Sequence, residues 1–417
     1  MKIDDKTSHN SPSLRFPEFT GEWEESTIGK EFDLYSGNTP SRLNKEHFNG
    51  AINWISSGEL KNHYIYSSKE QISEDAAKNL KLLPKGTFVI AIYGLEAEGV
   101  RGTGSITQEP STISQACMAF IPQGDIENEF LYSWYKKHGE VIGVRYAQGT
   151  KQQNLSYDIL EKFKIAYPSI KEQKKLNKFI ALLDERIAVQ NRLIEDLKKL
   201  RCAIIENVFC SPNHNESALR FKGNTDPLST YRMEDFCSRI TRKNKDNQCS
   251  LVLTIAAQYG LVDQESFFNK TVASENLAGY YLLHKGEFAY NRSYSAGYDW
   301  GAVKRLEKYP EGVLSTLYIC FKIDESAVDS DYLAYYFEST KWHKGLSDIA
   351  GEGARNHGLL NVSVNDYFNT RHRFHCMREQ KIIASMLNVI SQKENDEIAL
   401  YDNYQKQKQY LLRKMFI

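Results

Sequence analysis

The sequence predicts an α/β (α+β) fold in which two similar mixed α/β domains are separated by a long antiparallel two-helix coiled coil, as a pseudo-twofold internal repeat. First, Glu172-Gln173-Lys174 begins a heptad-patterned segment that ends at Phe209, and Glu379-Gln380-Lys381 begins a second that ends at Phe416. The two segments align without a gap at an offset of 207 residues, and such a repeat describes how a whole chain is built. Second, each segment follows a stretch of short strand-like runs and polar loops, as in mixed α/β domains.

The repeat continues more faintly into the globular parts. Short matching segments recur at offsets between 200 and 207 residues, while the sequences between them differ almost completely. We therefore expect one scaffold used twice with two different surfaces. The matching pairs are Leu14-Arg15-Phe16 with Leu219-Arg220-Phe221, Leu82–Phe88 with Leu282–Phe288, Phe130-Leu131-Tyr132 with Tyr332-Leu333-Ala334, and Asn154-Leu155-Ser156 with Asn361-Val362-Ser363.

The long segments read as helices of roughly 57 Å at about 1.5 Å per residue. Apolar residues in the first alternate spacings of four and three, broken only at Gln190 and Arg201. The second keeps apolar ends but has a polar centre with Glu394 and Glu397. We expect the helices to pack antiparallel on each other; the alternative is that each packs on its own domain or on a partner. The partner-binding candidates in the polar middle are Gln190, Arg201, Glu394 and Glu397.

The predicted boundaries divide the chain into four parts. They are a first domain over residues 1–170, a first long helix over 171–211, a second domain over 212–375 and a second long helix over 376–417. The expected strands are Ala51–Ile55, Thr87–Tyr93, Cys117–Ile121, Leu251–Ala256, Glu287–Asn291 and Tyr318–Ile323, with short helices at Phe130–Gly139 and Tyr332–Thr340.

Composition narrows the class of protein. A chain of 417 residues suits two to four domains, and 41% hydrophobic residues exclude extensive disorder. The 53 basic residues equal the 53 acidic ones, which excludes a strongly basic, non-specific DNA coat. Seven scattered cysteines without a Cys-x-x-Cys pair indicate neither a disulfide framework nor a zinc site. With no signal peptide or membrane span in the pattern, we expect a cytoplasmic protein.

Polar loops between the expected strands carry the candidate binding residues. They are rich in Arg, Lys, Asn, Gln, Ser and Thr, the side chains that hydrogen-bond to base edges, and in Tyr and Trp. Gly99–Gly104 lacks the spacing of a phosphate-binding loop, and we interpret it as an ordinary loop. The DNA-binding candidates are Thr39, Arg42, Trp54, Ser57, Arg101, Lys151, Gln152, Gln153, Arg242, Lys243, Asn244, Tyr259, Asn291, Arg292, Tyr298, Arg355 and Asn356.

No catalytic chemistry is indicated. The sequence has no adenine-methyltransferase Asn/Asp-Pro-Pro-aromatic tetrapeptide, no Walker loop and no convincing nuclease cluster of carboxylates and lysine. Basic runs such as Arg239–Lys245 are usually exposed to solvent, and we interpret this one in the same way. His343, His357, His372 and His375 lack metal-ligand spacing, so we expect structural roles for them. We assign no catalytic residue and no metal ligand.

The order of these parts resembles the specificity subunit of a type I restriction–modification enzyme over nearly the full chain. The residues behind the resemblance follow the chain from its beginning to its end. They are Leu14–Phe19 with Trp23-Glu24, Ser36–Pro40, Asn53-Trp54-Ile55, Leu82–Gly86, Asn154-Leu155-Ser156 and the Glu-Gln-Lys helices that end in Val208-Phe209 and Met415-Phe416.

The resemblance implies two target-recognition domains, each reading one half of a bipartite double-stranded DNA site, on helices that dock two modification (methyltransferase) subunits. It implies no cofactor in this chain; S-adenosylmethionine, ATP and Mg²⁺ would belong to the modification and the restriction/translocation subunits. Two unlike readers on one spacer should recognise unlike half-sites about a helical turn apart, roughly 34 Å centre to centre. The second helix departs from the first at Glu394 and Glu397, which stand where the first has Ile187 and Gln190.

Two hypotheses of other classes stay open. One is a stand-alone DNA methyltransferase or nuclease, which methyl transfer by the purified chain alone would establish. The other is a protein-binding scaffold or decoy that does not read sequence. A gel shift with the methyltransferase partner present, but without preference among DNA sequences, would favour that scaffold.

Overall fold

The computed structural model of the chain describes residues 10–97, 99–149, 153–224, 226–269, 276–293, 297–349, 355–356 and 359–417. The chain divides into two compact units: Met1–Arg192 with Ala399–Ile417, and Leu193–Ile398. Each long helix contributes one part to each unit, so both units combine a globular domain with two helix segments.

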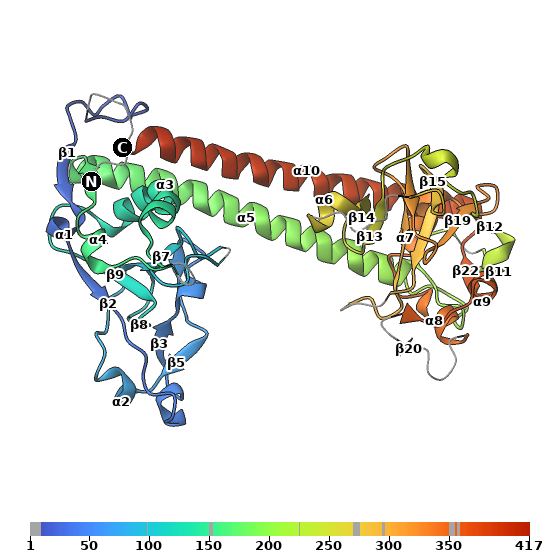
Figure 1. Cartoon of the computed structure of the whole chain (residues 1–417), viewed down its shortest axis with the longest axis horizontal. Helices are drawn as coiled ribbons and strands as arrows, with labels where there is room; N and C mark the ends of the chain where they lie inside the picture. Colours follow the sequence, from blue (N-terminus) through green and yellow to red (C-terminus); the bar gives the residue numbers. More distant parts are fainter. Residues whose placement is uncertain are drawn as a thin grey trace. The chain divides into compact units, whose positions relative to one another are not determined.

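The first unit is built on a five-stranded sheet in the order β2-β9-β6-β7-β4. The pairs are antiparallel except β4 with β7. A smaller sheet, β5-β3-β8, lies at the end of the unit away from α5 (Figure 1). The strands are β1 (Glu24–Thr27), β2 (Phe32–Ser36), β3 (Ile52–Ile55), β4 (Tyr64–Ile65), β5 (Glu70–Ile72), β6 (Phe88–Ala91), β7 (Gly104–Thr107), β8 (Ser111–Ile113), β9 (Cys117–Pro122) and β10 (Lys164–Tyr167).

The helices of the first unit surround these sheets, and the longest of the short ones, α3, packs on the five-stranded sheet. Phe88 of β6 meets Tyr132 and Tyr135 of α3 edge-on, with ring centroids 5.9 and 5.8 Å away. This aromatic contact packs α3 on the five-stranded sheet. The helices are α1 (Ile28–Glu31), η1 (Lys45–Phe48), η2 (Ser57–Glu59), α2 (Glu74–Ala77), α3 (Asn128–Tyr146) and α4 (Tyr157–Leu160), η denoting 3-10 helices.

The second unit repeats the same plan with a four-stranded antiparallel sheet, β12-β19-β16-β17. Its strands are β11 (Ser229–Arg232), β12 (Cys237–Arg239), β13 (Leu253–Ala256), β14 (Gly260–Asp263), β15 (Tyr281–His284), β16 (Phe288–Asn291), β17 (Ala302–Arg305), β18 (Glu311–Leu314), β19 (Ile319–Ile323), β20 (Arg355–Asn356), β21 (Leu359–Leu360) and β22 (Arg371–Phe374). Its helices are η3 (Met233–Asp235), η4 (Lys245–Asn247), α6 (Gln264–Phe268), α7 (Ser330–Tyr336), α8 (His343–Ser347) and α9 (Val364–Phe368).

The topologies confirm the predicted duplication. The order β2-β9-β6-β7 in the first unit matches β12-β19-β16-β17 in the second, and the pair β1-β10 matches β11-β22. The expected strands correspond to β3, β6, β9, β13, β16 and β19. The first expected short helix is longer than predicted, since α3 continues to Tyr146.

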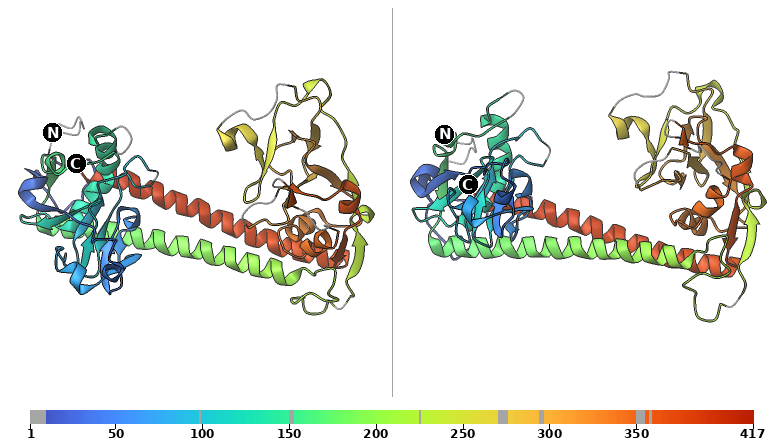
Figure 2. Two further views of the ribbon diagram at one scale, coloured as in Figure 1. Left: turned by 60° about the horizontal axis from the view of Figure 1, so that its bottom comes forward. Right: turned by 90° about the horizontal axis from the view of Figure 1, so that it is seen from below.

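The long helices are α5 (Ile170–Val208) and α10 (Met377–Met415), with 39 residues each. In the first unit Lys408 of α10 pairs with Asp184 of α5, and the guanidinium of Arg186 lies 4.5 Å from the ring centroid of Tyr404. In the second unit Arg201 Nε lies 3.1 Å from Glu394 Oε2. The segments run antiparallel in each unit, as predicted (Figure 2).

The helix ends belong to the domain cores. In the first unit Phe416 packs on Phe130 of α3, with ring centroids 5.2 Å apart. In the second unit Phe209 packs on Tyr332 of α7 at 5.0 Å. The identity of Phe209 and Phe416 in the repeat therefore reflects one core position used twice. Burial of a phenylalanine side chain stabilises each junction by about 1.5–3 kcal/mol.

Candidate nucleic-acid interface

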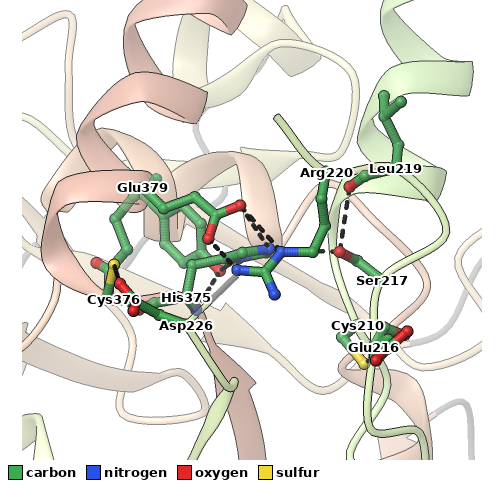
Figure 3. A network of polar contacts seen from close by, with 11 residues as sticks. Cys210, Glu216, Ser217, Leu219, Arg220, Asp226, His375, Cys376 and Glu379 are labelled. Carbon is green, nitrogen blue, oxygen red and sulfur yellow. Dashed lines mark hydrogen bonds and ion pairs between the residues drawn. The ribbon is translucent and has the colours of Figure 1, made fainter. Parts of the chain in front are cut away.

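Each unit fastens its long helices with the same arginine–glutamate pair. In the first unit Arg15 donates to Glu172 through Nε at 2.8 Å and through its terminal nitrogen at 2.7 Å. In the second unit Arg220 donates to Glu379 at 3.2 and 2.5 Å, as Figure 3 shows. Both glutamates are buried, so each carboxylate depends on its bidentate partner.

The adjacent glutamines complete this joint. Gln173 accepts from the backbone N–H of Glu127 at 3.0 Å and donates to the Pro168 carbonyl at 2.9 Å. Gln380 accepts from the Asp329 N–H at 2.8 Å and donates to the His375 carbonyl at 2.9 Å. The repeated Glu-Gln pair is thus a structural clamp between each domain and the helix that follows it.

The polar network around His375 is structural as well. His375 Nδ1 lies 2.7 Å from the Tyr332 hydroxyl, while Nε2 lies 3.4 Å from Ser217 Oγ and 3.9 Å from Glu379 Oε1 (Figure 3). A catalytic triad places the acid on the ring nitrogen opposite the nucleophile, whereas here both lie near Nε2. Burial lowers the pKa of His375 to about 4, so the ring is neutral at pH 7.

The loop that follows β2 in the first unit is held at several points. Gly37 is required there because a Cβ would lie 1.9 Å from the Ile113 carbonyl oxygen. The indole N–H of Trp54 donates to the Asn38 carbonyl at 2.9 Å, and the Thr39 hydroxyl bonds to the Gln115 side chain. Trp54 is only 4% exposed. It therefore belongs to the core beneath the loop, a correction to its expected place on a binding surface.

Arg42 lies on this loop but is already paired. Its guanidinium donates twice to Glu70 at 2.8 Å and lies 4.5 Å from the ring centroid of Phe48. Ser57 is half-buried in η2, whose first turn is closed by a capping box between Ser56 and Glu59. Both predicted residues thus contribute to loop structure in the unbound protein.

A second loop of the first unit approaches the first. Arg101 donates to the Gln153 side chain at 3.0 Å, and Gln148 and Asn154 pair through their backbones at 2.8 and 2.9 Å. A cavity of about 510 Å³ is lined by Ser36 at the end of β2, where the first loop begins, and by Gln148 and Asn154 from the second loop. The structure thus brings together two of the loops expected to bind. Lys151 and Gln152 lie outside the described residues.

The loop after β12 in the second unit is also fixed by hydrogen bonds to neighbouring segments. Arg242 donates to the Leu282 carbonyl at 3.2 Å and to Glu287 at 2.6 Å. Lys243 donates to the Gly279 carbonyl at 2.8 Å. Asn244 is fully buried and bonds to the backbone of Cys249, which is a second correction to a residue expected on the surface.

The remaining candidates of the second unit differ in exposure. Tyr259 is exposed, whereas Tyr298 is half-buried against the core of β13–β18. Asn291 accepts from the Ser293 N–H at 2.9 Å, and Arg292 donates to the carbonyls of Val362 and Leu317 at 3.0 and 3.1 Å. For Arg355 and Asn356 the structure describes only the backbone, in β20.

The candidate partner residues of the long helices are engaged within the units. Arg201 bridges Glu394 and Glu338, and Glu397 is buried and pairs with Lys393. Gln190 is buried. The polar interruptions in the helical pattern thus coincide with internal contacts, and their expected role in binding partners stays a prediction.

The first unit contains a charged cluster around His63 that was not predicted from the sequence. His63 Nε2 lies 2.8 Å from Glu129 of α3 and Nδ1 lies 2.9 Å from Asp184 of α5. The imidazole stacks between Tyr64 and Tyr132, with centroids 4.1 and 4.0 Å away. These residues are far apart in the sequence and form no motif, so no local signal could have identified them.

The described residues contain no group of three or more His, Cys, Asp or Glu side chains able to hold a metal ion. Within the same residues, no helix has the length and apolar character needed to cross a membrane.

Comparisons with known proteins agree with this architecture. Residues 20–199 match the family described as Type I restriction modification DNA specificity domain. Over 194 residues the chain is 29% identical to the type I restriction enzyme MjaIX specificity subunit of Methanocaldococcus jannaschii, covering 45% of this chain and 44% of that protein. Over 192 residues it is 31% identical to the EcoR124I/EcoR124II specificity subunit of Escherichia coli, covering 45% of this chain and 46% of that protein.

The matched stretch thus spans less than half the length of either relative. Among solved structures, the S subunit of a type I restriction–modification system from M. genitalium aligns with a TM-score of 0.56 at 15% identity. That alignment covers 98% of this chain and 99% of the other, and it shows a shared fold.

Proposed function

We propose, from the match of residues 20–199 to the family described as Type I restriction modification DNA specificity domain, that this chain is a DNA-recognition subunit. Each globular domain reads one half of a bipartite double-stranded site. The chain itself performs no chemistry; two modification subunits bound to it transfer methyl groups from S-adenosylmethionine, and restriction/translocation subunits use ATP and Mg²⁺.

The observation that carries the proposal is the contrast between identical joints and unlike loops. Arg15–Glu172 and Arg220–Glu379 repeat one clamp, and Gln173 and Gln380 repeat its second half. Between the repeated segments, the two domains differ almost completely in sequence. Two readers on one scaffold suit an asymmetric target, because the scaffold is constant while the contacts with bases vary.

Docking of two equal partners is supported by exposed apolar residues at equivalent repeat positions. Leu182 of α5 is 55% exposed and Val389 of α10 is 68% exposed, at the offset of 207 residues. Beside Val389, Ile382 and Met386 line a shallow groove on α10. Apolar side chains left in water on a helix stabilise a complex when a partner covers them. We place the docking sites here.

The experiment compares the purified chain alone with its complex with the host's own modification subunits. The complex should bind one DNA sequence at least tenfold more tightly than scrambled DNA in fluorescence anisotropy, and it should transfer methyl groups. The chain alone should transfer none. Equal affinity of the complex for all sequences would support the scaffold hypothesis, and methyl transfer by the chain alone would contradict the proposal.

A further inference from the structure

One loop recurs in both units with a single dissimilar position. Ser41-Arg42-Leu43-Asn44-Lys45-Glu46 matches Thr241-Arg242-Lys243-Asn244-Lys245-Asp246 at an offset of 200 residues. Arg, Asn and Lys are identical, and Ser/Thr and Glu/Asp are similar. Each loop follows an equivalent strand, β2 or β12, and leads into a 3-10 helix, η1 or η4. The outlier is Leu43 in one unit and Lys243 in the other.

The identical residues hold the loop in place. Arg42 is neutralised by Glu70, and Arg242 by Glu287. Asn44 accepts from the Glu46 N–H at 3.2 Å, and Asn244 accepts from the Cys249 N–H at 2.9 Å. An arginine whose fork already binds a carboxylate is poorly placed to hydrogen-bond to a base as well. We therefore infer that these two arginines and two asparagines fix the conformation of their loops, and we call them the loop frame.

The variable position presents its side chain differently in the two units. Leu43 is 98% exposed. Its loop is ordered around it, with the Asn44 N–H donating to the Ser41 carbonyl at 3.3 Å and the His47 N–H to the Asn44 carbonyl at 3.2 Å. Single exposed apolar residues are common on protein surfaces. This one occupies the single unlike position of a duplicated, held loop.

Lys243 carries an ammonium group at the same position. It donates to the Gly279 carbonyl, which takes one of its three donors, and lies 4.1 Å from the ring centroid of Tyr281. The position between the framing arginine and asparagine thus carries an apolar side chain, Leu43, in one unit and a hydrogen-bond donor, Lys243, in the other. These chemistries complement different base edges in the major groove, where thymine has a methyl group and guanine has two acceptors.

We propose that positions 43 and 243 are specificity-determining: Leu43 contacts a thymine methyl in one half-site, and Lys243 donates to guanine N7 or O6 in the other. The assignment rests on the proposed function of DNA reading. It adds Leu43 to the predicted DNA-binding residues and gives Lys243 a specific base to contact.

The test uses the full chain with its host's modification subunits, and maps methylated sites across a genome for Leu43→Lys and Lys243→Leu. Leu43→Lys should reduce the preference for thymine at one position of a single half-site by about tenfold or more. Lys243→Leu should reduce the preference for guanine in the other half-site only. Leu82→Lys, which changes a 53% exposed leucine elsewhere in the first unit, should leave the site unchanged.

Thermal unfolding checks that each variant is folded, and Leu43→Ala provides a second test without an added charge. It should weaken the same thymine preference. The inference is overturned by an unchanged half-site in Leu43→Lys and Leu43→Ala, or by a loss that is equal for all sequences. A wild-type complex without any bipartite site would instead overturn the proposed function and the inference with it.

Discussion

At the scale of single residues, a second junction between each domain and its long helices uses a different cation in each unit. In the first unit His63 joins Glu129 of α3 to Asp184 of α5. In the second unit Arg305 lies 2.7 Å from Asp331 of α7, whose other oxygen accepts from Asn388 of α10 at 2.7 Å. Histidine titrates near neutral pH and arginine does not, so only the first junction should depend on pH.

The pKa of His63 determines whether the first junction becomes stronger or weaker as pH rises. Burial opposes the charged ring, but the carboxylates of Asp184 and Glu129 beside it outweigh burial and raise the pKa of His63 above its ordinary value of 6.5. Because the folded pKa is higher, the stabilisation is complete below about 6.5 and is lost as pH rises through the folded value. Burial and the nearby charge of Lys408 lower the pKa of Lys136 to about 8. The stability of the folded unit therefore rises with pH above about 8 through this group, opposite to the effect of His63. That contribution cancels when the wild type and a His63 variant are compared.

We expect His63→Gln to lower the free energy of opening of the first unit by about 2 kcal/mol at pH 6 and by much less at pH 9. Hydrogen–deuterium exchange of the α3 amides measures this difference. Arg305→Gln, followed through the α7 amides, is the control and should cost the same at both pH values. An equal cost of His63→Gln at pH 6 and pH 9 would show that the ring is not a charged clamp.

At the scale of elements, the sequence predicted which segments repeat but not what the repeated residues do. The strands β3, β6 and β9 follow apolar runs, and the long helices follow a heptad pattern, so periodicity was sufficient for them. Glu172 is identical to Glu379 for a reason visible only in space, because its partner Arg15 lies far away in the sequence. Trp54 lies in β3 and is buried, whereas its predicted contact with DNA followed from the polar residues after it in the sequence.

The buried clamp of the second unit gives the next prediction. Arg220→Ala leaves the fully buried carboxylate of Glu379 unpaired and should destabilise that unit by about 3–5 kcal/mol. Arg220→Ala combined with Glu379→Leu should recover part of the loss, since the charge is removed. Arg232→Ala breaks an exposed pair with Glu234 and should cost less than about 1 kcal/mol. Thermal unfolding compares the four proteins. A single variant no less stable than the double one would contradict the buried-charge explanation.

The docking sites proposed on the long helices predict how many modification subunits each variant binds. Leu182→Glu and Val389→Glu should each remove one of two modification subunits, and the double variant should remove both. Leu200→Glu is the matched control, because Leu200 is exposed and apolar but its repeat equivalent is Gln407. Mass photometry gives the stoichiometry. Loss of both subunits from one single variant would argue against two independent sites.

At the scale of the whole molecule, the account rests on a duplicated scaffold with unlike surfaces. The residues of the two arginine–glutamate clamps could be recognised as repeats in the sequence, whereas their pairing and the matching sheet orders are visible only in the structure. Arg42, Trp54 and Asn244 share their residue types with base-reading side chains, and the structure shows each of them holding its own loop. Their contacts with DNA stay a prediction. Only the partners of a polar side chain distinguish those roles.

Exchange of residues 23–165 for the corresponding domain of a homologue tests the central claim most directly. The chimaera is expressed with the host's modification subunits, and methylated positions are mapped across the genome. The account predicts that one half of the bipartite site changes while the other half is retained. A simultaneous change of both halves would contradict the account.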